Sequence, residues 1–354
     1  MQTEVLITSR ANERANAVAQ AVAFLRKGEI VALPTETVYG LAADALNPIA
    51  VAKIFEAKER PRFDPVIVHL PSRDWLEKIA DLSEHNQQLI LKLADRFWPG
   101  PFTMVLPKRE IVPEIVTSGL NTVAVRISAH PVFADIVCEL DHPLAAPSAN
   151  RFGRVSPTTA QHVLDELEGQ IPLIIDAGPT EHGLESTIVS LRGNSIDILR
   201  RGPITAEQLS EFAKVNIVAS PAQKISAPGQ LSSHYAPKTP LRLIDDAKSF
   251  STEKNQRVGL LAWHPDSRKG DLQFAQRRAG DRRSLKFVAI RNLSERQDLR
   301  EAAANLFRFL RELDQSDVDL ILAERVPSQG LGAAILDRLE RASHGQSVAS
   351  DMPE

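Results

Sequence analysis

Apolar positions in the first two hundred residues follow both helical and strand periods. Val18, Ala21, Val22 and Leu25 recur every three or four residues before a glycine, which predicts an amphipathic helix over 11–27. Other helices are predicted over 49–57, 83–97 and 156–167, the last capped at Ser156 with Pro157 in its first turn. Thr205 opens one more helix through a capping box. Short apolar runs predict strands at 30–33, 66–70, 102–106, 122–127, 173–176, 186–191 and 195–200. Because these elements do not alternate strictly, the fold class is α/β with a sheet of mixed direction.

The pattern changes after Val218. Residues 219–240 are rich in proline, serine and glycine, which is typical of a linker, and beyond it strands and helices alternate. Strands are predicted at 241–244, 258–263, 287–290 and 320–324, with helices at 297–313 and 331–342. We therefore expect a first domain over 1–217, a linker over 218–240 and a smaller Rossmann-like α/β domain over 241–354.

The composition of the 354 residues is that of an ordinary globular protein, with 43% hydrophobic and 25% charged residues. The net charge of −3 argues against a general polyanion-binding surface. Cys138, the single cysteine, lies in an apolar run and is expected to be buried, and a chain without disulfides fits a reducing cytoplasm. We find no run of about 18 apolar residues and no signal peptide, so no membrane association is predicted.

A hydroxyl-rich segment follows the strand at 30–33, with the sequence Leu33-Pro-Thr-Glu-Thr-Val-Tyr-Gly-Leu41. Thr35 and Thr37 share one face if the segment is extended, and Gly40 permits a close backbone approach. Lys58 and Arg60 would point the same way from an extended loop, and together they suit phosphate oxygens. The alternative is a surface turn with solvated charges.

Arg126 lies within the apolar strand 122–127, where a charge requires a partner that a substrate carboxylate would provide. For four other polar groups the residues leave two interpretations open. His69 is a functional group or a satisfied strand histidine, and Ser148 with Asn150 forms a ligand site or a polar turn. Ser186 and Thr187 contact a ligand or form a hydroxyl pair between strands, and Arg200 with Arg201 grips phosphate or ends a strand in solvent.

Several common chemistries are excluded by their motifs. The chain has no Walker loop, no dinucleotide-binding glycine pattern, no nucleophile elbow and no His-Glu-x-x-His. Any use of ATP therefore occurs without a Walker loop, and no protein-held metal site is predicted.

Six segments in this order resemble the YrdC-like threonylcarbamoyl-AMP synthase family. They are residues 33–41, 58–61, 96–103, 122–127, 145–150 and 185–189, and the likeness continues through 232–238, which is similar to the linker of the family's two-domain form with its C-terminal extension. The resemblance implies a YrdC-like twisted mixed sheet with flanking helices. It also implies a nucleotidyltransferase that condenses L-threonine, bicarbonate and ATP to threonylcarbamoyl-AMP and pyrophosphate. Other proteins then use the adenylate to form t6A at position 37 of tRNA.

The resemblance also assigns residues to the two substrates. L-threonine is expected near Thr37, His69, Arg126, Ala146 and Ser186. ATP, with Mg²⁺, is expected near Lys58, Arg60, Asp64, Thr122, Ser148, Asn150, Ser156, Arg200 and, from the linker, Tyr235, with Lys58 and Arg60 as the catalytic cations. Asp64 replaces an asparagine that is usual in the family, so we expect it to face Mg²⁺ or a cation. The linker is expected to act as a lid.

Two alternatives remain at this stage. One is an RNA-binding module without synthase activity; a low net charge and 5% aromatic residues argue against it, although a weak contact with tRNA stays possible. The other is a regulator whose C-terminal domain binds a small ligand.

Overall fold

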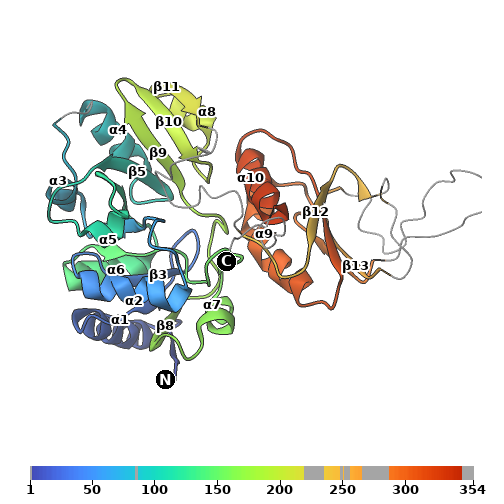
Figure 1. The fold of residues 1–354 in the computed structure, drawn as a ribbon, viewed down its shortest axis with the longest axis horizontal. Coiled ribbons are helices and arrows are strands. Elements are labelled where there is room, and N and C mark those ends of the chain that lie inside the picture. Colours follow the sequence, from blue (N-terminus) through green and yellow to red (C-terminus); the bar gives the residue numbers. More distant parts are fainter. Residues whose placement is uncertain are drawn as a thin grey trace, which may run out of the picture. The chain divides into compact units, whose positions relative to one another are not determined.

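The computed structural model describes residues 2–83, 87–218, 235–247, 250, 256–264 and 287–344 (Figure 1). The chain divides into two compact units, which we treat separately. The first comprises Met1–Phe152 and Ser156–Leu231, and the second comprises Gly153–Val155 and Ser232–Glu354. Most of the predicted lid, residues 219–234, lies outside the described residues.

The first unit is built on a sheet in which 11 strands are described, in the order β1-β8-β2-β3-β7-β4-β6-β5-β9-β10-β11. The strands are β1 Glu4–Ile7, β2 Val31–Leu33, β3 Gly40–Asp44, β4 Ile67–His69, β5 Phe102–Pro107, β6 Thr122–Arg126, β7 Leu144–Ala145, β8 Leu173–Asp176, β9 Thr187–Arg192, β10 Ser195–Arg200 and β11 Lys214–Ile217. Some neighbours pair in parallel, such as β4 with β6, and others are antiparallel, such as β5 with β6. The predicted mixed sheet is confirmed.

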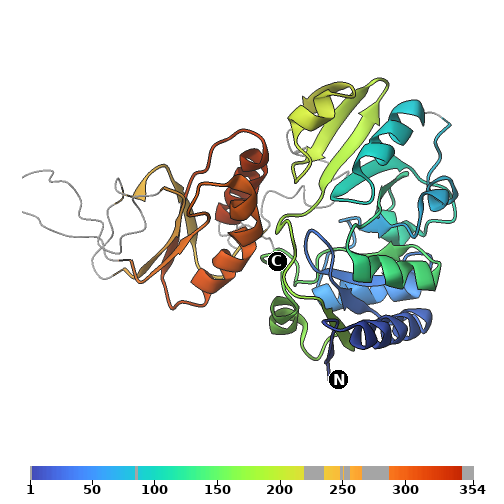
Figure 2. The same ribbon diagram turned by 180° about the vertical axis from the view of Figure 1, so that it is seen from behind.

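Helices flank this sheet on both faces (Figures 1 and 2). They are α1 Ala11–Arg26, α2 Pro48–Lys58, a 3-10 turn at Arg73–Trp75, α3 Leu76–Ile79, α4 Gln87–Phe97, α5 Glu114–Thr117, α6 Pro131–Leu140, α7 Ala160–Leu167 and α8 Ala206–Ser210. The capping box at Thr205 is confirmed. The prediction that Ser156 caps a helix was wrong, because α7 begins at Ala160 and Thr159 is its N-cap.

Helix α6 was not predicted from the sequence, and Cys138 lies on its exposed side. Pro131 occupies the first turn, and apolar residues at helical spacing are buried against α1: Val132, Phe133, Ile136, Val137 and Leu140. Cys138 falls on the opposite side of this helix and is exposed, so the expectation of a buried cysteine was wrong. Its burial was predicted from the apolar run 136–138 alone, without the helical period of the flanking residues.

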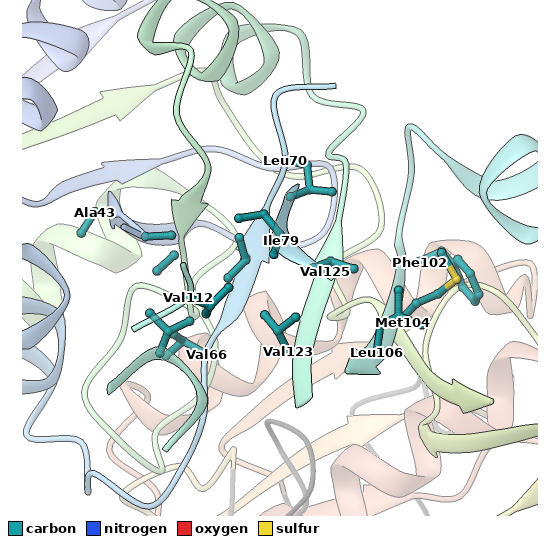
Figure 3. Packing of buried hydrophobic residues seen from close by; sticks show 14 of the residues in the cluster. Ala43, Val66, Leu70, Ile79, Phe102, Met104, Leu106, Val112, Val123 and Val125 are labelled. Carbon is teal, nitrogen blue, oxygen red and sulfur yellow. The ribbon is translucent and has the colours of Figure 1, made fainter. Parts of the chain in front are cut away.

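The strand period places different residues on the two faces of the sheet. In Figure 3, Val123 and Val125 of β6 lie on the same side as Met104 and Leu106 of β5, and these cross-strand neighbours belong to the main hydrophobic core. The alternate positions of β6 therefore face the other side. There, Ala124 joins a small apolar cluster with Ile67, Val105 and Ile188. Arg126 shares this second face.

The second unit is a small parallel sheet with the strand order β12-β15-β13-β14. Its strands are β12 Leu241–Ile244, β13 Val258–Ala262, β14 Ala289–Asn292 and β15 Leu320–Glu324, and its helices are α9 Leu299–Asp314 and α10 Leu331–Ser343. Every strand pair is parallel, which confirms the Rossmann-like prediction. Among the described residues, no helix is both long and apolar enough to cross a membrane.

Glu324 joins three segments at the carboxyl edge of this sheet. Its side chain is fully buried and accepts hydrogen bonds from the backbone N–H groups of Ala247, Trp263 and His264, at 3.1, 2.8 and 2.8 Å. These segments follow β12 and β13, so one carboxylate holds the ends of three neighbouring strands together.

We expect Glu324→Ala to destabilise the second unit by about 2–4 kcal/mol, because three buried N–H groups lose their acceptor. Hydrogen exchange of peptides covering 258–264 would measure the loss. The matched control is Glu340→Ala, which removes a half-exposed partner of Arg325 and should change little. Equal effects of the two substitutions would contradict this role of Glu324.

Candidate active site

The hydroxyl-rich segment is a tight turn between β2 and β3. Thr35 Oγ1 accepts from the backbone N–H groups of Thr37 and Val38, and it lies 2.8 Å from Thr37 Oγ1. The two hydroxyls therefore meet, as expected, although through a turn and not an extended strand. A Cβ at Gly40 would lie 3.3 Å from the Cβ of Ala146, which explains why a glycine suits this close approach.

Arg126 ends β6 and is buried with Glu36 of this turn. Its guanidinium donates to Glu36 Oε1 and, at 3.3 Å, to Thr37 Oγ1, while Ser128 donates to Glu36 Oε2. A substrate carboxylate was expected as the partner of Arg126, and the structure shows that Glu36 provides a carboxylate partner within the protein. The sequence signal was present: Glu36 is a charge inside an otherwise apolar and hydroxyl-bearing run.

The guanidinium still has a free donor. Arg126 is 3% exposed, and its Nε is buried without a hydrogen-bond partner. Burial alone would raise the pKa of Glu36, but Arg126 and the Ser128 hydroxyl outweigh it and hold that pKa below its usual value. The result is a charged pair at neutral pH with one unused N–H.

His69 lies beside this pair at the end of β4. The parallel register places it opposite Arg126, and its ring centroid is 4.8 Å from that of Phe133. Burial, followed by the charge of Arg126, lowers the pKa of His69 well below the ordinary value. Its Nδ1 has no hydrogen-bond partner, so His69 is a neutral imidazole with an unused polar atom. Ala146 lies near this ring, directly after β7.

Lys58 does not lie on an extended loop with Arg60. It is the last residue of α2, and Glu59 turns the chain with a left-handed φ of 53°. The Lys58 ammonium donates to the carbonyls of Ser148, at 2.5 Å, and Asn150. It therefore holds the loop that carries these two predicted ligands. Burial and then Arg60 lower the pKa of Lys58 well below its usual value.

Arg60 and Asp64 form a second buried ion pair. Arg60 donates to the carbonyls of Asp64 and Pro65, at 3.1 and 2.7 Å, and its Nη2 lies 2.9 Å from Asp64 Oδ2. Neither carboxylate oxygen has a donor in hydrogen-bonding geometry. Burial raises the pKa of Asp64, against the opposing effects of Arg60, Lys58 and Arg200. Asp64 thus faces cations, one of the two environments expected for it.

Arg200 brings β10 into contact with Ser186. Its guanidinium donates to the carbonyl and the hydroxyl of Ser186, at 3.1 and 3.0 Å, and the same hydroxyl lies 2.8 Å from Thr103 Oγ1. A Cβ at Gly202 would lie 2.4 Å from the backbone nitrogen of Thr187. Gly202 is therefore required for this segment to pack against Ser186.

The structure also describes two further predicted residues, Ser156 and Thr122. Ser156 is buried and donates to Glu185 Oε1 at 2.5 Å, next to Ser186 in sequence. Thr122 begins β6, at the opposite end from Arg126.

Tyr235 belongs to the second unit. Its ring is buried and stacks on Phe307 at a centroid distance of 5.5 Å, with the Arg338 guanidinium 5.1 Å from its centroid. Its backbone is left-handed, with φ of 63°. The prediction that Tyr235 contacts ATP is not tested by these contacts, which show only how the ring is held within its own unit.

The first unit thus gathers two groups of predicted residues. One unites Thr37, His69 and Arg126 with the unpredicted Glu36 and Ser128, and the other unites Lys58, Arg60 and Asp64 within electrostatic reach of Arg200. The first group suits a small polar ligand with a carboxylate, and the second suits a polyanion. Among the described residues, no three His, Cys, Asp or Glu side chains cluster as metal ligands would.

The chain is similar to known proteins over most of its length. Residues 23–202 match the Sua5, YciO and YrdC family described as telomere recombination, and residues 204–344 match the C-terminal domain of threonylcarbamoyl-AMP synthase. The chain is 38% identical to threonylcarbamoyl-AMP synthase of Pyrococcus abyssi, over 91% of this chain and 93% of the relative. It is also 38% identical to the Bacillus subtilis enzyme of that name, over 94% of each chain.

A solved structure shows the same architecture. The crystal structure of P. abyssi Sua5 complexed with L-threonine matches with a TM-score of 0.81 and 34% identity, over 98% of both chains. These relatives give no support to an RNA-binding module. On sequence and fold alike, the chain belongs to the threonylcarbamoyl-AMP synthase family, in the two-domain form.

Proposed function

We propose that this protein is an L-threonylcarbamoyladenylate synthase, a nucleotidyltransferase that condenses L-threonine, bicarbonate and ATP to threonylcarbamoyl-AMP and pyrophosphate. The observation that carries the proposal is full-length similarity to enzymes of this name, in a chain whose buried Arg126 retains an unused N–H beside a hydroxyl pair. Other tRNA-modification proteins would consume the adenylate to form t6A, and we keep the cytoplasm as the predicted location.

In this proposal L-threonine binds beside the Glu36–Arg126 pair. The free Nε–H of Arg126 would donate to the substrate carboxylate, and the Thr37 hydroxyl and the neutral His69 would contact its polar groups. Ala146 and Ser186 complete the proposed contacts. A neutral imidazole supports this arrangement, since it can accept a hydrogen bond from an ammonium or hydroxyl group.

ATP would bind beside the second group of residues, which comprises Lys58, Arg60 and Asp64 within electrostatic reach of Arg200. Arg60 and Arg200 are the proposed phosphate contacts, with Thr122, Asp64, Ser148, Asn150 and Ser156 around them and Tyr235 from the second unit. Lys58 would act in part indirectly, because its ammonium already holds the loop that carries Ser148 and Asn150. Fixed cations that need not reorganise stabilise developing phosphoryl charge most effectively.

The residues present fit a Mg²⁺ ion that arrives with ATP. Both oxygens of the buried Asp64 carboxylate lack a directional hydrogen bond, and Mg²⁺ commonly takes one or two carboxylates together with phosphate oxygens and water. When bound, the ion would neutralise triphosphate charge. Asp64 is the residue we propose to hold it.

The reaction needs no covalent enzyme intermediate. The unprotonated amine of threonine attacks the carbon of CO₂ or bicarbonate to form a carbamate, and this step releases a proton in the first case and water in the second. A carbamate oxygen then attacks the α-phosphorus while pyrophosphate leaves in line. The protein contributes position and charge: Arg126 holds the carboxylate, and Arg60 and Arg200 spread the phosphoryl charge.

The direct test is pyrophosphate release from ATP and Mg²⁺, with L-threonine and bicarbonate omitted in turn. We expect release to require both, and mass spectrometry to detect the adenylate. Release that does not depend on threonine, together with salt-sensitive RNA binding, would contradict the proposal and favour the RNA-binding module.

Arg126→Gln should raise the KM for threonine at least about tenfold while the KM for ATP stays within about twofold, because a carboxylate contact is lost only from one substrate. Steady-state kinetics on the folded variant measure both constants. Arg73→Gln, at a half-exposed arginine, is the matched control. Equal increases in both constants would remove Arg126 from the threonine site.

The neutral state of His69 also predicts a pH effect on stability. Below about pH 6.5 the unfolded imidazole takes up a proton that the buried one excludes, so the free energy of unfolding should fall by up to about 1.4 kcal/mol per pH unit. The lowered pKa of His130 acts in the same direction. In urea unfolding at pH 5.0 to 7.5, His69→Asn should reduce this slope and His142→Asn, at a half-exposed site, is the control. An unchanged slope in His69→Asn would refute the assignment.

A further inference from the structure

The charge balance around Arg126 is set within the protein. Glu36 accepts from Arg126 through one carboxylate oxygen and from Ser128 through the other, and its side chain is 4% exposed. A buried arginine without this partner would leave an excess positive charge at the proposed threonine site. With Glu36 in place, the pair is neutral and still keeps the Nε–H of Arg126 unused.

The other titratable groups that face the pair do not change this balance at neutral pH. His69 on β4 is uncharged because burial and Arg126 lower its pKa. His130, before α6, has its pKa lowered by burial, although Glu36 acts in the opposite direction. Arg14 of α1 acts on His130 but is itself paired with Asp135 at the surface.

One more cation is connected to the proposed threonine site. Arg200 donates to the Ser186 hydroxyl, and Asp64 lies within its electrostatic reach. This charge belongs to the proposed phosphate cluster. It is the same whichever residue stands at position 36, so a comparison of variants at that position isolates the effect of Glu36.

We infer that Glu36 determines substrate specificity: by balancing the charge of Arg126, it makes the pocket accept a zwitterionic amino acid in preference to a simple carboxylate. This inference rests on the proposed function, since it concerns the same threonine site. A zwitterion carries no net charge and binds a neutral pocket without leaving an unbalanced ion, whereas a monoanion would add an uncompensated negative charge in a poorly solvated site. Specificity of this kind depends on a penalty against the wrong ligand.

The probe is (R)-3-hydroxybutyrate, which has the carboxylate and hydroxyl of L-threonine but lacks the amine. Calorimetric titration of the full chain should show that this anion binds at least about tenfold more weakly than L-threonine. In Glu36→Gln, which keeps the shape and removes the charge, the anion should bind more tightly, and the ratio of the two dissociation constants should fall at least about tenfold. A gain in affinity for one ligand is not a result of structural damage.

Glu139→Gln is the matched control, because it removes the same charge from an exposed position on α6 and should leave the ratio unchanged. An unchanged ratio in Glu36→Gln, or equal weakening of both ligands, would overturn the inference. Equal affinities in the unaltered protein would overturn it even if Glu36→Gln did not fold. Failure of the unaltered protein to bind threonine at all would contradict the proposed function itself, and the pyrophosphate assay distinguishes that case.

Discussion

The first unit depends on the rule that a buried charge must have a partner. Arg126 at the end of β6 and Glu36 in the β2–β3 turn satisfy it for each other, over a separation of 90 residues. Their hydrogen bonds also fix Thr37 and Ser128. Separating the two charges would leave each unpaired in a site with little solvent. This energetic penalty holds the β2–β3 turn and the end of β6 in one arrangement. The proposed threonine site is therefore formed before any substrate binds.

The same rule organises the cations on the proposed ATP side. Lys58 is held by two backbone carbonyls, and Arg60 by two carbonyls and the Asp64 carboxylate. The carbonyls that orient Lys58 and Arg60 belong to loop residues. Asp64 offsets part of the positive charge through its ion pair with Arg60, whereas the carbonyls orient the cations without adding a negative charge.

The second unit uses a buried carboxylate for a different purpose. Glu324 binds backbone N–H groups at the carboxyl edge of a parallel sheet, the place where Rossmann-like domains commonly bind their ligands. In this protein, its own Glu324 carboxylate accepts the hydrogen bonds of three N–H groups at this edge. Tyr235 is likewise held within this unit, between Phe307 and Arg338.

Much of this architecture could be predicted from the sequence. Apolar periods of two and about 3.6 residues predicted most strands and helices, because those periods reflect local geometry. The order of these elements along the chain predicted a mixed sheet in the first unit and a Rossmann-like one in the second. The motifs also indicated the family and the positions that carry charge. The helical spacing of apolar residues in α6 is also present in the sequence. Cys138 was predicted to be buried because that prediction used only the three-residue apolar run 136–138.

Only the tertiary structure decided which charges meet. Glu36 and Arg126, Lys58 and the 148–150 loop, and Arg200 and Ser186 are joined by contacts across 14 to 92 residues. A residue's type states that it needs a partner, but strand order and register decide which partner lies within reach. The sequence therefore determined the type of most elements and the position of Arg126 within an apolar strand. The fold decided that a carboxylate of the protein already balances Arg126, because that depends on a register that local sequence does not contain.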